Sequence, residues 1–213
     1  MNTKQYIDSY LSNYPKIKVK YLDELAKIFI KENKNIEDLH EFLKDKDNHY
    51  LRRIYFQVNL MRRKTLKEKF EFIDNNLKLL QRWEDTDMIL NYLPKKSCNS
   101  AIFFKARSYI KEKDEFSKRL GYVLLLNQVY KEKVFLNEIF KLFENDERYY
   151  VLMAQAWVIS YLYMKFPSDT YDFLKNSNLS YKIKSKAISK ILDSYQIDNI
   201  EKEKVRKLRA SVR

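Results

Sequence analysis

Glycine and proline are scarce in this chain of 213 residues, which contains one glycine, Gly121, and three prolines, Pro15, Pro94 and Pro167. Tight β-hairpins and glycine-rich phosphate loops need residues at positive φ, a conformation that glycine adopts at little cost. A sequence with one glycine has almost no residues suited to either structure. We therefore predict an all-α protein without a glycine-rich nucleotide loop.

Cysteine and histidine are also rare. Cys98 is the only cysteine, so an internal disulfide is impossible, and a single thiol, which we interpret as a small core residue, fits a reducing cytoplasm. His40 and His49 are isolated from any partner at metal-ligand spacing. The sequence therefore predicts no metal site and no cofactor.

Long apolar runs are absent as well. No stretch of about 18 consecutive apolar residues occurs, and the first residues contain no apolar run after their positive charge. We expect neither an export signal nor a membrane-spanning helix. The predicted location is the bacterial cytoplasm or nucleoid.

Positive charge is in excess. The chain has 42 lysines and arginines against 29 acidic residues, which gives a formal net charge of +13. Such an excess favours polyanions through long-range attraction, although a lysine-, asparagine- and isoleucine-rich composition also results from base-composition bias. The 17 tyrosines show no arrangement typical of single-strand stacking domains. We therefore expect a monomer that binds double-stranded DNA.

The most apolar stretch covers residues 148–167, and its apolar residues recur at helical spacing around most of the circumference, which predicts a central core helix that ends at Pro167. Shorter helices are predicted over residues 3–13, 21–31 and 36–43. Long helices should begin near residues 50, 84, 116, 149 and 181, about 32 to 34 residues apart. Each is followed by a second helix, over residues 66–80, 98–111, 133–143, 168–176 and 200–209.

This period is typical of helical repeats. The signatures of tetratricopeptide and ankyrin repeats are absent, and the predicted repeats share only a hydrophobic pattern, as in HEAT-like arrays. We predict a single domain over residues 1–213, folded as a right-handed α-solenoid of about six HEAT-like helical hairpins. The alternative is a non-repetitive helical bundle.

Four blocks of sequence resemble those of one known family. Residues 79–87 read Leu-Leu-Gln-Arg-Trp-Glu-Asp-Thr-Asp, residues 115–126 read Glu-Phe-Ser-Lys-Arg-Leu-Gly-Tyr-Val-Leu-Leu-Leu, residues 149–157 read Tyr-Tyr-Val-Leu-Met-Ala-Gln-Ala-Trp, and residues 186–195 read Lys-Ala-Ile-Ser-Lys-Ile-Leu-Asp-Ser-Tyr. In this order they resemble the DNA alkylation repair family, which comprises HEAT-like repeat DNA glycosylases of the AlkD type and non-catalytic relatives. The resemblance extends roughly over residues 66–205.

The resemblance implies a catalytic site of Trp83, Asp87, Arg119 and Trp157. Asp87 would stabilise positive charge on the sugar, Arg119 would grip a phosphate, and the two indoles would attract a cationic base. The spacing agrees, because Trp83 and Asp87 are four residues apart and Asp87 and Arg119 are 32 apart, about one repeat. Taken singly, Trp157 is typical of a core residue, Asp87 of a helix start and Arg119 of a solvated surface.

Basic residues near these blocks are candidates for contact with the DNA backbone. They are Lys118, Arg52, Arg53, Arg62, Arg63, Lys182, Lys184, Lys186 and Lys190. The alternative for each is a solvated helix face. The family pattern differs at residues 49–53, which replace an acidic pair, at Gln196, which replaces an arginine, and at Arg82, which replaces an asparagine, so contacts with DNA are expected to differ there.

The resemblance therefore implies a DNA glycosylase that removes cationic 3-methyl or 7-methyl purines from duplex DNA. A non-catalytic binder of damaged, bent or branched DNA is the first alternative. A protein-binding HEAT scaffold is the second.

The net charge generates a prediction about binding. At low salt the chain should bind duplex DNA, and the affinity should fall steeply as salt rises, because the release of counterions from phosphates drives such binding. Titrations of two duplexes of unrelated sequence at several salt concentrations measure both the salt slope and the lack of sequence preference. Salt-independent binding, or no binding at low salt, contradicts both DNA hypotheses and favours the protein scaffold.

Overall fold

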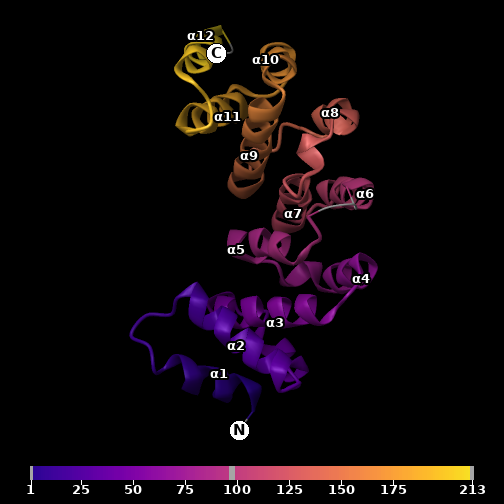
Figure 1. Cartoon of the computed structure of the whole chain (residues 1–213), viewed down its shortest axis with the longest axis vertical. Helices are drawn as coiled ribbons and strands as arrows, with labels where there is room; N and C mark the ends of the chain where they lie inside the picture. Colours follow the sequence, from indigo (N-terminus) through magenta and orange to yellow (C-terminus); the bar gives the residue numbers. More distant parts are fainter. Residues whose placement is uncertain (1, 96–98, 212–213) are drawn as a thin grey trace. The chain divides into compact units, whose positions relative to one another are not determined.

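A computed structural model describes residues 2–95 and 99–211 of the chain (Figure 1). Every regular element in these ranges is helical and no strand occurs within them, which confirms the predicted all-α class. Cys98, which we interpreted as a core residue, lies outside the described residues.

The helices form two compact units, Met1–Pro94 and Lys95–Arg213. Each unit buries a core of its own, with Leu25 and Ile54 among the fully buried residues of the first unit and Val123 and Val158 among those of the second. The single domain predicted over residues 1–213 stays a prediction.

The first unit is built from α-helices that are joined by short 3-10 helices. In its described residues these are α1 (Thr3–Leu11), α2 (Val19–Lys31), η1 (Glu37–Phe42), η2 (Lys46–Asn48), α3 (His49–Arg62), α4 (Leu66–Asn76), η3 (Leu77–Leu79), α5 (Trp83–Asp87) and η4 (Met88–Tyr92). Capping boxes start α1, where Asn2 pairs with Gln5, and α4, where Thr65 pairs with Glu68. The amphipathic α2 packs its apolar face against α3.

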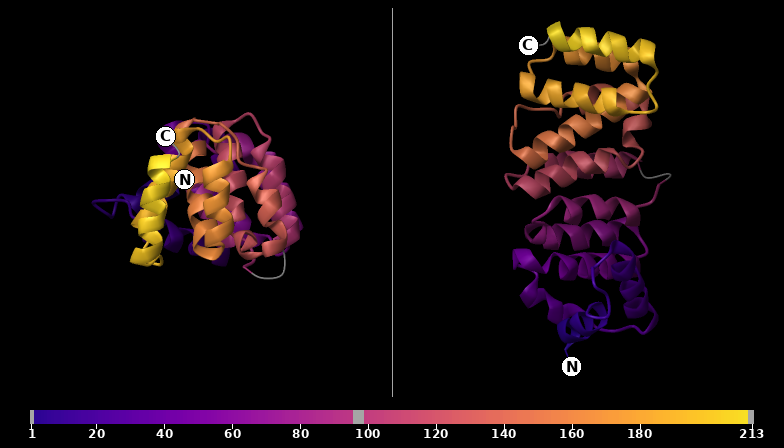
Figure 2. Two further views of the ribbon diagram at one scale, coloured as in Figure 1. Left: turned by 90° about the horizontal axis from the view of Figure 1, so that it is seen from above. Right: turned by 90° about the vertical axis from the view of Figure 1, so that its left-hand side faces the viewer.

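The second unit is arranged around α9 (Tyr149–Lys165), as the sequence predicts. Its other described helices are α6 (Asn99–Ile110), α7 (Glu115–Leu125), η5 (Val129–Lys131), α8 (Lys133–Phe140), α10 (Pro167–Asn176), α11 (Tyr181–Asp193) and α12 (Asn199–Ser211). Because α9 packs against α7, α10 and α11, it is buried on several sides, and Val151, Ala154 and Val158 are inaccessible to solvent. The next pair, α11 and α12, lies side by side (Figure 2).

The spacing of the helices confirms the predicted period. The first helices of successive pairs begin at residues 49, 83, 115, 149 and 181, which are 32 to 34 residues apart. The second helices of these pairs, α4, α6, α8, α10 and α12, each begin within one residue of the predicted start. Pro167 ends α9 and also occupies the first turn of α10, where the missing N–H group costs nothing.

Two predicted helices differ from the structure. Within residues 36–43 the structure has the 3-10 helix η1, which has no side-chain cap at Ile36. Its first turn is formed by the i to i+3 hydrogen bond from the Leu39 N–H to the Ile36 carbonyl. The long helix predicted near residue 84 is the short α5, followed by η4. The Thr86 hydroxyl donates to the Trp83 carbonyl at 2.8 Å, a bond that competes with the regular helical pattern.

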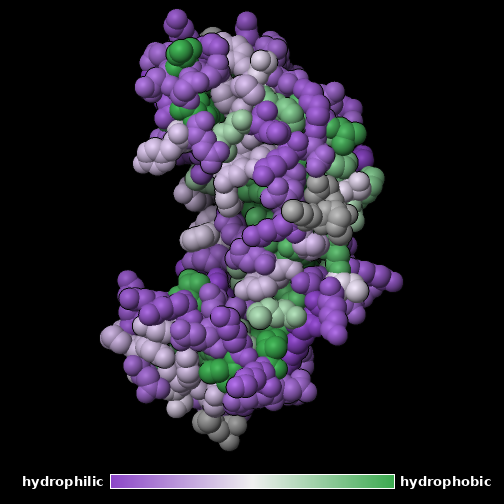
Figure 3. Space-filling view, viewed as in Figure 1, coloured by the Kyte–Doolittle hydropathy of each residue, from purple (hydrophilic) through white to green (hydrophobic). Residues whose placement is uncertain are grey.

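The surface is hydrophilic over most of the face shown in Figure 3, in line with a chain of which 33% is charged. Large apolar side chains are exposed at separate places, such as Phe104 on α6, Val134 on α8 and Ile200 on α12. Single exposed apolar residues are normal on soluble domains and do not define an interface.

Gly121 lies where α7 crosses α6. A Cβ atom at this position would lie 2.6 Å from the backbone nitrogen of Ile110 and 2.8 Å from the carbonyl oxygen of Ala106. Backbone atoms have no rotamer that would relieve such contacts. The glycine is therefore used for the close approach of two helices, while the described positions at positive φ are occupied by Asn33 and Gln128.

The substitution Gly121→Ala should therefore destabilise the second unit by about 1–3 kcal/mol, the usual cost of overpacking a core. If Gly121 were an ordinary helix glycine, alanine would instead stabilise α7 by about 1 kcal/mol through its higher helix propensity. Urea unfolding followed by circular dichroism gives the sign of the change. A stabilised variant would contradict the close packing of α6 and α7.

Candidate nucleic-acid interface

Trp83 and Asp87 are the first and last residues of α5, so their side chains lie on the same side of this short helix. Trp83 is 47% exposed, and Asp87 is partly exposed. Oδ1 of Asp87 lies 2.9 Å from Oγ1 of Thr86, whose single proton is shared between this carboxylate and the Trp83 carbonyl. The structure thus presents an indole and a carboxylate together.

Asp85, not Asp87, holds the start of α5. Its Oδ2 atom accepts hydrogen bonds from the backbone N–H groups of Gln81 and Arg82, each at 3.0 Å, and from Nε of Arg52 at 3.1 Å. Burial raises the pKa of Asp85, and these three donors act in the opposite direction. The helix-start role that the sequence allowed for Asp87 therefore belongs to its neighbour.

Arg52 is fully buried, which corrects its assignment as a DNA contact. Besides the bond to Asp85, its guanidinium donates to the carbonyl oxygens of Leu43 at 3.1 Å, Asp45 at 2.5 Å and Lys46 at 3.2 Å. A guanidinium enclosed by these acceptors cannot also reach a phosphate. The residue instead ties α3 and the preceding turn to α5.

Arg119 is also nearly buried, with 5% of its surface exposed. Its Nη1 atom donates to the carbonyl oxygen of Tyr150 at 2.9 Å, which joins α7 to α9 within the second unit. The neighbouring Lys118 pairs with Glu144 and, at 3.4 Å, with Asp146. Both predicted phosphate contacts of this block thus have partners within the protein.

Trp157 is only partly buried, although the apolar character of its helix is typical of a core residue. It is partly exposed and lines a pocket of about 360 Å³ between α9 and the end of α11. The Trp157 and Tyr161 rings meet edge to face at 6.2 Å, and Tyr161 meets Tyr130 in the same way at 5.2 Å. These contacts hold the indole at the wall of the pocket.

The four predicted catalytic residues belong to different units. Trp83 and Asp87 lie on α5 of the first unit, whereas Arg119 and Trp157 lie on α7 and α9 of the second, which pack against each other. The two residues of the first unit share one helix, and the two residues of the second unit lie on a pair of helices in contact. That all four form one site stays a prediction.

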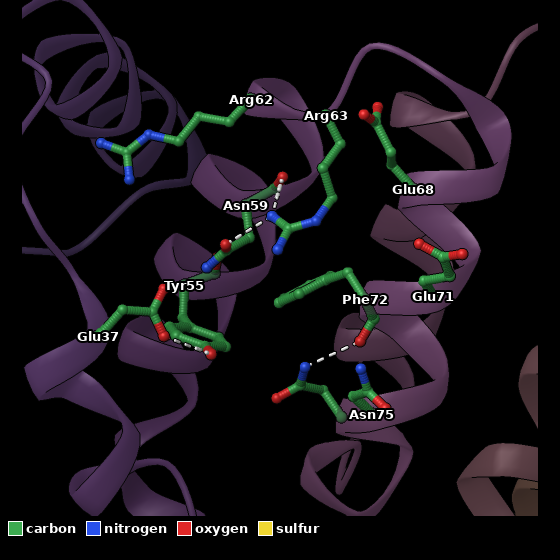
Figure 4. A pocket seen from close by; sticks show the side chains of 10 residues that line it. Glu37, Tyr55, Asn59, Arg62, Arg63, Glu68, Glu71, Phe72 and Asn75 are labelled. Carbon is green, nitrogen blue, oxygen red and sulfur yellow. Dashed lines mark hydrogen bonds between the residues drawn. The ribbon is translucent and has the colours of Figure 1, made fainter.

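Arg63 lines a second pocket, of about 530 Å³, in the first unit (Figure 4). Its guanidinium lies 4.3 Å from the centre of the Phe72 ring and donates from Nη1 to Oδ1 of Asn59 at 2.7 Å. Across the pocket, Tyr55 donates to Glu37 at 3.3 Å, and burial raises the pKa of Tyr55 to about 12. Arg63 is thus a pocket wall, which the sequence did not predict.

The other two predicted DNA contacts of the first unit, Arg62 and Arg53, have partners within the protein as well. Arg62 donates to the carbonyl oxygens of Phe29 and Lys34 and so caps the end of α2. Arg53 pairs with Asp23 at 3.2 Å and has a side chain that is 17% exposed. These contacts favour a structural role over a contact with DNA.

The predicted lysines of α11 divide into one buried and three surface residues. Lys184 is 7% exposed, donates to the Ser177 carbonyl at 2.7 Å, and has a pKa lowered by burial, so its assignment as a DNA contact is also corrected. Lys182, Lys186 and Lys190 recur every four residues, which places them on one face about 6 Å apart along the axis. We call these three residues the α11 lysine ridge. It ends at the pocket of Trp157, which Lys190 also lines.

Sequence reasoning missed two further groups. Lys16 and Lys18, in the segment between α1 and α2, and Lys20, in the first turn of α2, are all exposed. Their alternation with Ile17 and Val19 after Pro15 was a visible sequence feature. The second group is the loop after α11, where Tyr195 is fully exposed beside the pocket of Trp157.

Comparison with known proteins adds no relative. No family model, no curated protein and no solved structure matches the chain. Within the described residues, no cluster of histidine, cysteine and acidic side chains is arranged to hold a metal ion, and none of the helices has the length and apolarity of a membrane span.

Because Asp85 is the counter-charge of buried Arg52, Asp85→Ala should lower the free energy of unfolding by about 3–5 kcal/mol. The matched control is Glu84→Ala, which removes a carboxylate of the same helix that pairs with Arg82 at the surface and should cost less than about 1 kcal/mol. Urea unfolding measures both variants. Equal effects would contradict the structural role given to the pair.

Proposed function

We propose that this chain is a DNA repair protein that binds duplex DNA and hydrolyses the N-glycosidic bond of cationic alkylated purines, such as 3-methyl and 7-methyl adducts. The pairing of Trp83 with Asp87 on α5 is the observation that supports this function most. Of the three acidic residues of α5, Asp85 is withdrawn into the core, whereas Asp87 is partly exposed beside an exposed indole. The resemblance of the surrounding block supplies the reaction.

The main contribution that this reaction requires from the protein is stabilisation of the positive charge that develops on the sugar. When the bond between the sugar and an alkylated purine breaks, the electron pair leaves with the already cationic base, and positive charge develops on the sugar. A carboxylate near the sugar stabilises this charge, and the attacking water gives one proton to that carboxylate or to solvent water as its oxygen bonds to the sugar carbon. Asp87 supplies the carboxylate, and Trp83 at the other end of α5 offers an indole face to the cation.

Binding of the duplex is assigned to cations that lie at the surface. The α11 lysine ridge is the strongest candidate, because its side chains share one face and Lys182 is 65% exposed even though it pairs with Glu147 at 3.2 Å. Contacts of this kind follow phosphates and read no bases. Lys16, Lys18 and Lys20 provide a second exposed basic segment in the first unit.

We also propose the right-handed α-solenoid form for the whole chain. The regular interval of 32 to 34 residues between first helices and the paired second helices support a HEAT-like repeat. In such an array, equivalent positions of successive repeats share one surface. Asp87 and Arg119 are separated by one interval of this kind.

A non-catalytic DNA-binding protein is the second candidate. The burial of Arg119 favours it, because a side chain that is 5% exposed and bonded to the Tyr150 carbonyl is poorly placed to grip a phosphate next to a reacting sugar. A binder needs the surface lysines but not a poised carboxylate. The two candidates differ in what Asp87 does.

The decisive variant is Asp87→Asn, which keeps the size and polarity of the side chain but removes its charge. In a glycosylase, release of 3-methyl or 7-methyl purines from methylated duplex DNA should fall about 10²-fold, a typical loss for one electrostatic stabiliser. Duplex affinity should hold or rise, because a charge that repels phosphate has gone. Chromatography of the released bases and a binding titration measure the two effects.

Glu84→Gln is the matched control, since it neutralises another carboxylate of α5 that is about one-third exposed. It should leave base release unchanged. Equal rates for wild-type protein and Asp87→Asn would remove Asp87 from the mechanism. A wild-type protein that binds duplex DNA but releases no base identifies the non-catalytic candidate, and one that does not bind at low salt rejects both.

A further inference from the structure

The pocket of Trp157 is built from two segments of the second unit that are tied together. One wall is α9, with Trp157, Tyr161 and Met164, and the other is the end of α11 with the loop at residues 194–196. The Ser194 hydroxyl donates to the sulfur of Met164 at 3.3 Å and accepts a bond from the backbone N–H of Gln196 at 3.2 Å. The Ser194 side chain therefore contacts α9, and the Gln196 N–H is bonded back to it across Tyr195.

Tyr195 itself is fully exposed, although the preceding residue, Ser194, contacts α9. Its ring contacts no other aromatic ring in the described part of the chain, whereas Trp157 and Tyr161 support each other edge to face. An aromatic ring that lies beside a pocket and is surrounded by water has its faces open for stacking. The pocket thus offers one anchored indole and one open phenol ring.

Polar groups complete the pocket. Lys190 and Asp193 bring opposite charges, and Ser194 and Gln196 bring a hydroxyl and an amide. Lys190 is also the last residue of the α11 lysine ridge, so a strand that follows the ridge reaches the pocket at this end. Aromatic faces beside a cation and hydrogen-bonding groups match the base, phosphate and base edge of a nucleotide.

We infer that this pocket binds one unstacked purine nucleotide of the DNA, with the base against Trp157 and Tyr195 and the phosphate near Lys190. The volume of about 360 Å³ lies at the lower end of the range of about 300–1,000 Å³ for small-molecule sites. The choice of ligand rests on the proposed function in DNA. The pocket adds to it a place for a nucleotide outside the base stack.

Nucleotide binding to this pocket can be measured by tryptophan fluorescence, because the chain has only two tryptophans. Trp83→Phe leaves Trp157 as the only tryptophan, so the indole emission of this variant reports on the pocket alone. We expect saturable quenching when deoxyguanosine monophosphate is added to the otherwise complete protein. Deoxyribose 5-phosphate, which has no base, should cause no quenching at the same concentrations.

Tyr195→Ala in the Trp83→Phe background should weaken the nucleotide about tenfold, a typical loss for one stacking partner. Tyr195→Phe is the matched control and should bind within twofold of the parent, because it keeps the ring. As Tyr195 is fully exposed, neither change is expected to alter folding, which thermal unfolding checks. Absence of saturable quenching, or equal affinities of the alanine and phenylalanine variants, would overturn the inference.

Failure of this inference and failure of the proposed function give different results. If the wild-type protein releases methylated purines but the nucleotide leaves Trp157 emission unchanged, the pocket is not a nucleotide site and the glycosylase stands. If the nucleotide quenches Trp157 emission, if Tyr195→Ala weakens this binding, and if no base is released, the nucleotide site is supported and the glycosylase activity is rejected.

Discussion

The buried pair of Arg52 and Asp85 is the interaction on which the first unit depends. Arg52 gathers three carbonyl oxygens from residues 43–46 and one carboxylate from α5, so a single guanidinium connects α3, the turn before it and the start of α5. A buried charge without its partner is far less favourable than the intact pair. The orientation of α5, and with it of Trp83 and Asp87, therefore follows from a contact that lies entirely inside the protein.

Much of the fold could be predicted from the sequence because the relevant properties are local. The scarcity of glycine, the helical spacing of apolar residues and the even interval between helices are all visible in the chain, and the all-α class and helix starts agree with them. The roles of single charges could not be predicted in this way. Arg52 and Lys184 resemble any surface cation in sequence, and only the carbonyl groups that the fold brings to them, such as that of Ser177, explain their burial. Asp85 and Asp87 differ by two positions, yet Asp85 is buried and bonds the start of a helix, whereas Asp87 is partly exposed.

In the second unit, one helix, α9, is mostly buried and also carries a partly exposed indole. α9 is buried between α7, α10 and α11, yet Trp157 reaches a pocket at its edge. The apolar environment of α9 suggested a core role for this indole, because large aromatic residues are mostly buried. The fold instead combines a rigid apolar helix with an accessible ring, and the α11 lysine ridge ends at the same place. A rigid support beneath an exposed aromatic side chain reduces the conformational entropy that is lost when a ligand stacks on it.

Gly121 has a consequence for how this chain can change over evolutionary time. The position that its absent side chain would fill is occupied by the backbone at Ala106 and Ile110, so no alternative rotamer in α6 makes room for a larger residue. A lineage that replaced the glycine would have to move α6 outward and refill the space between the helices with other side chains. Positions 106, 110 and 121 are therefore expected to vary as a group among relatives, and neutral drift at any one of them is restricted by the other two.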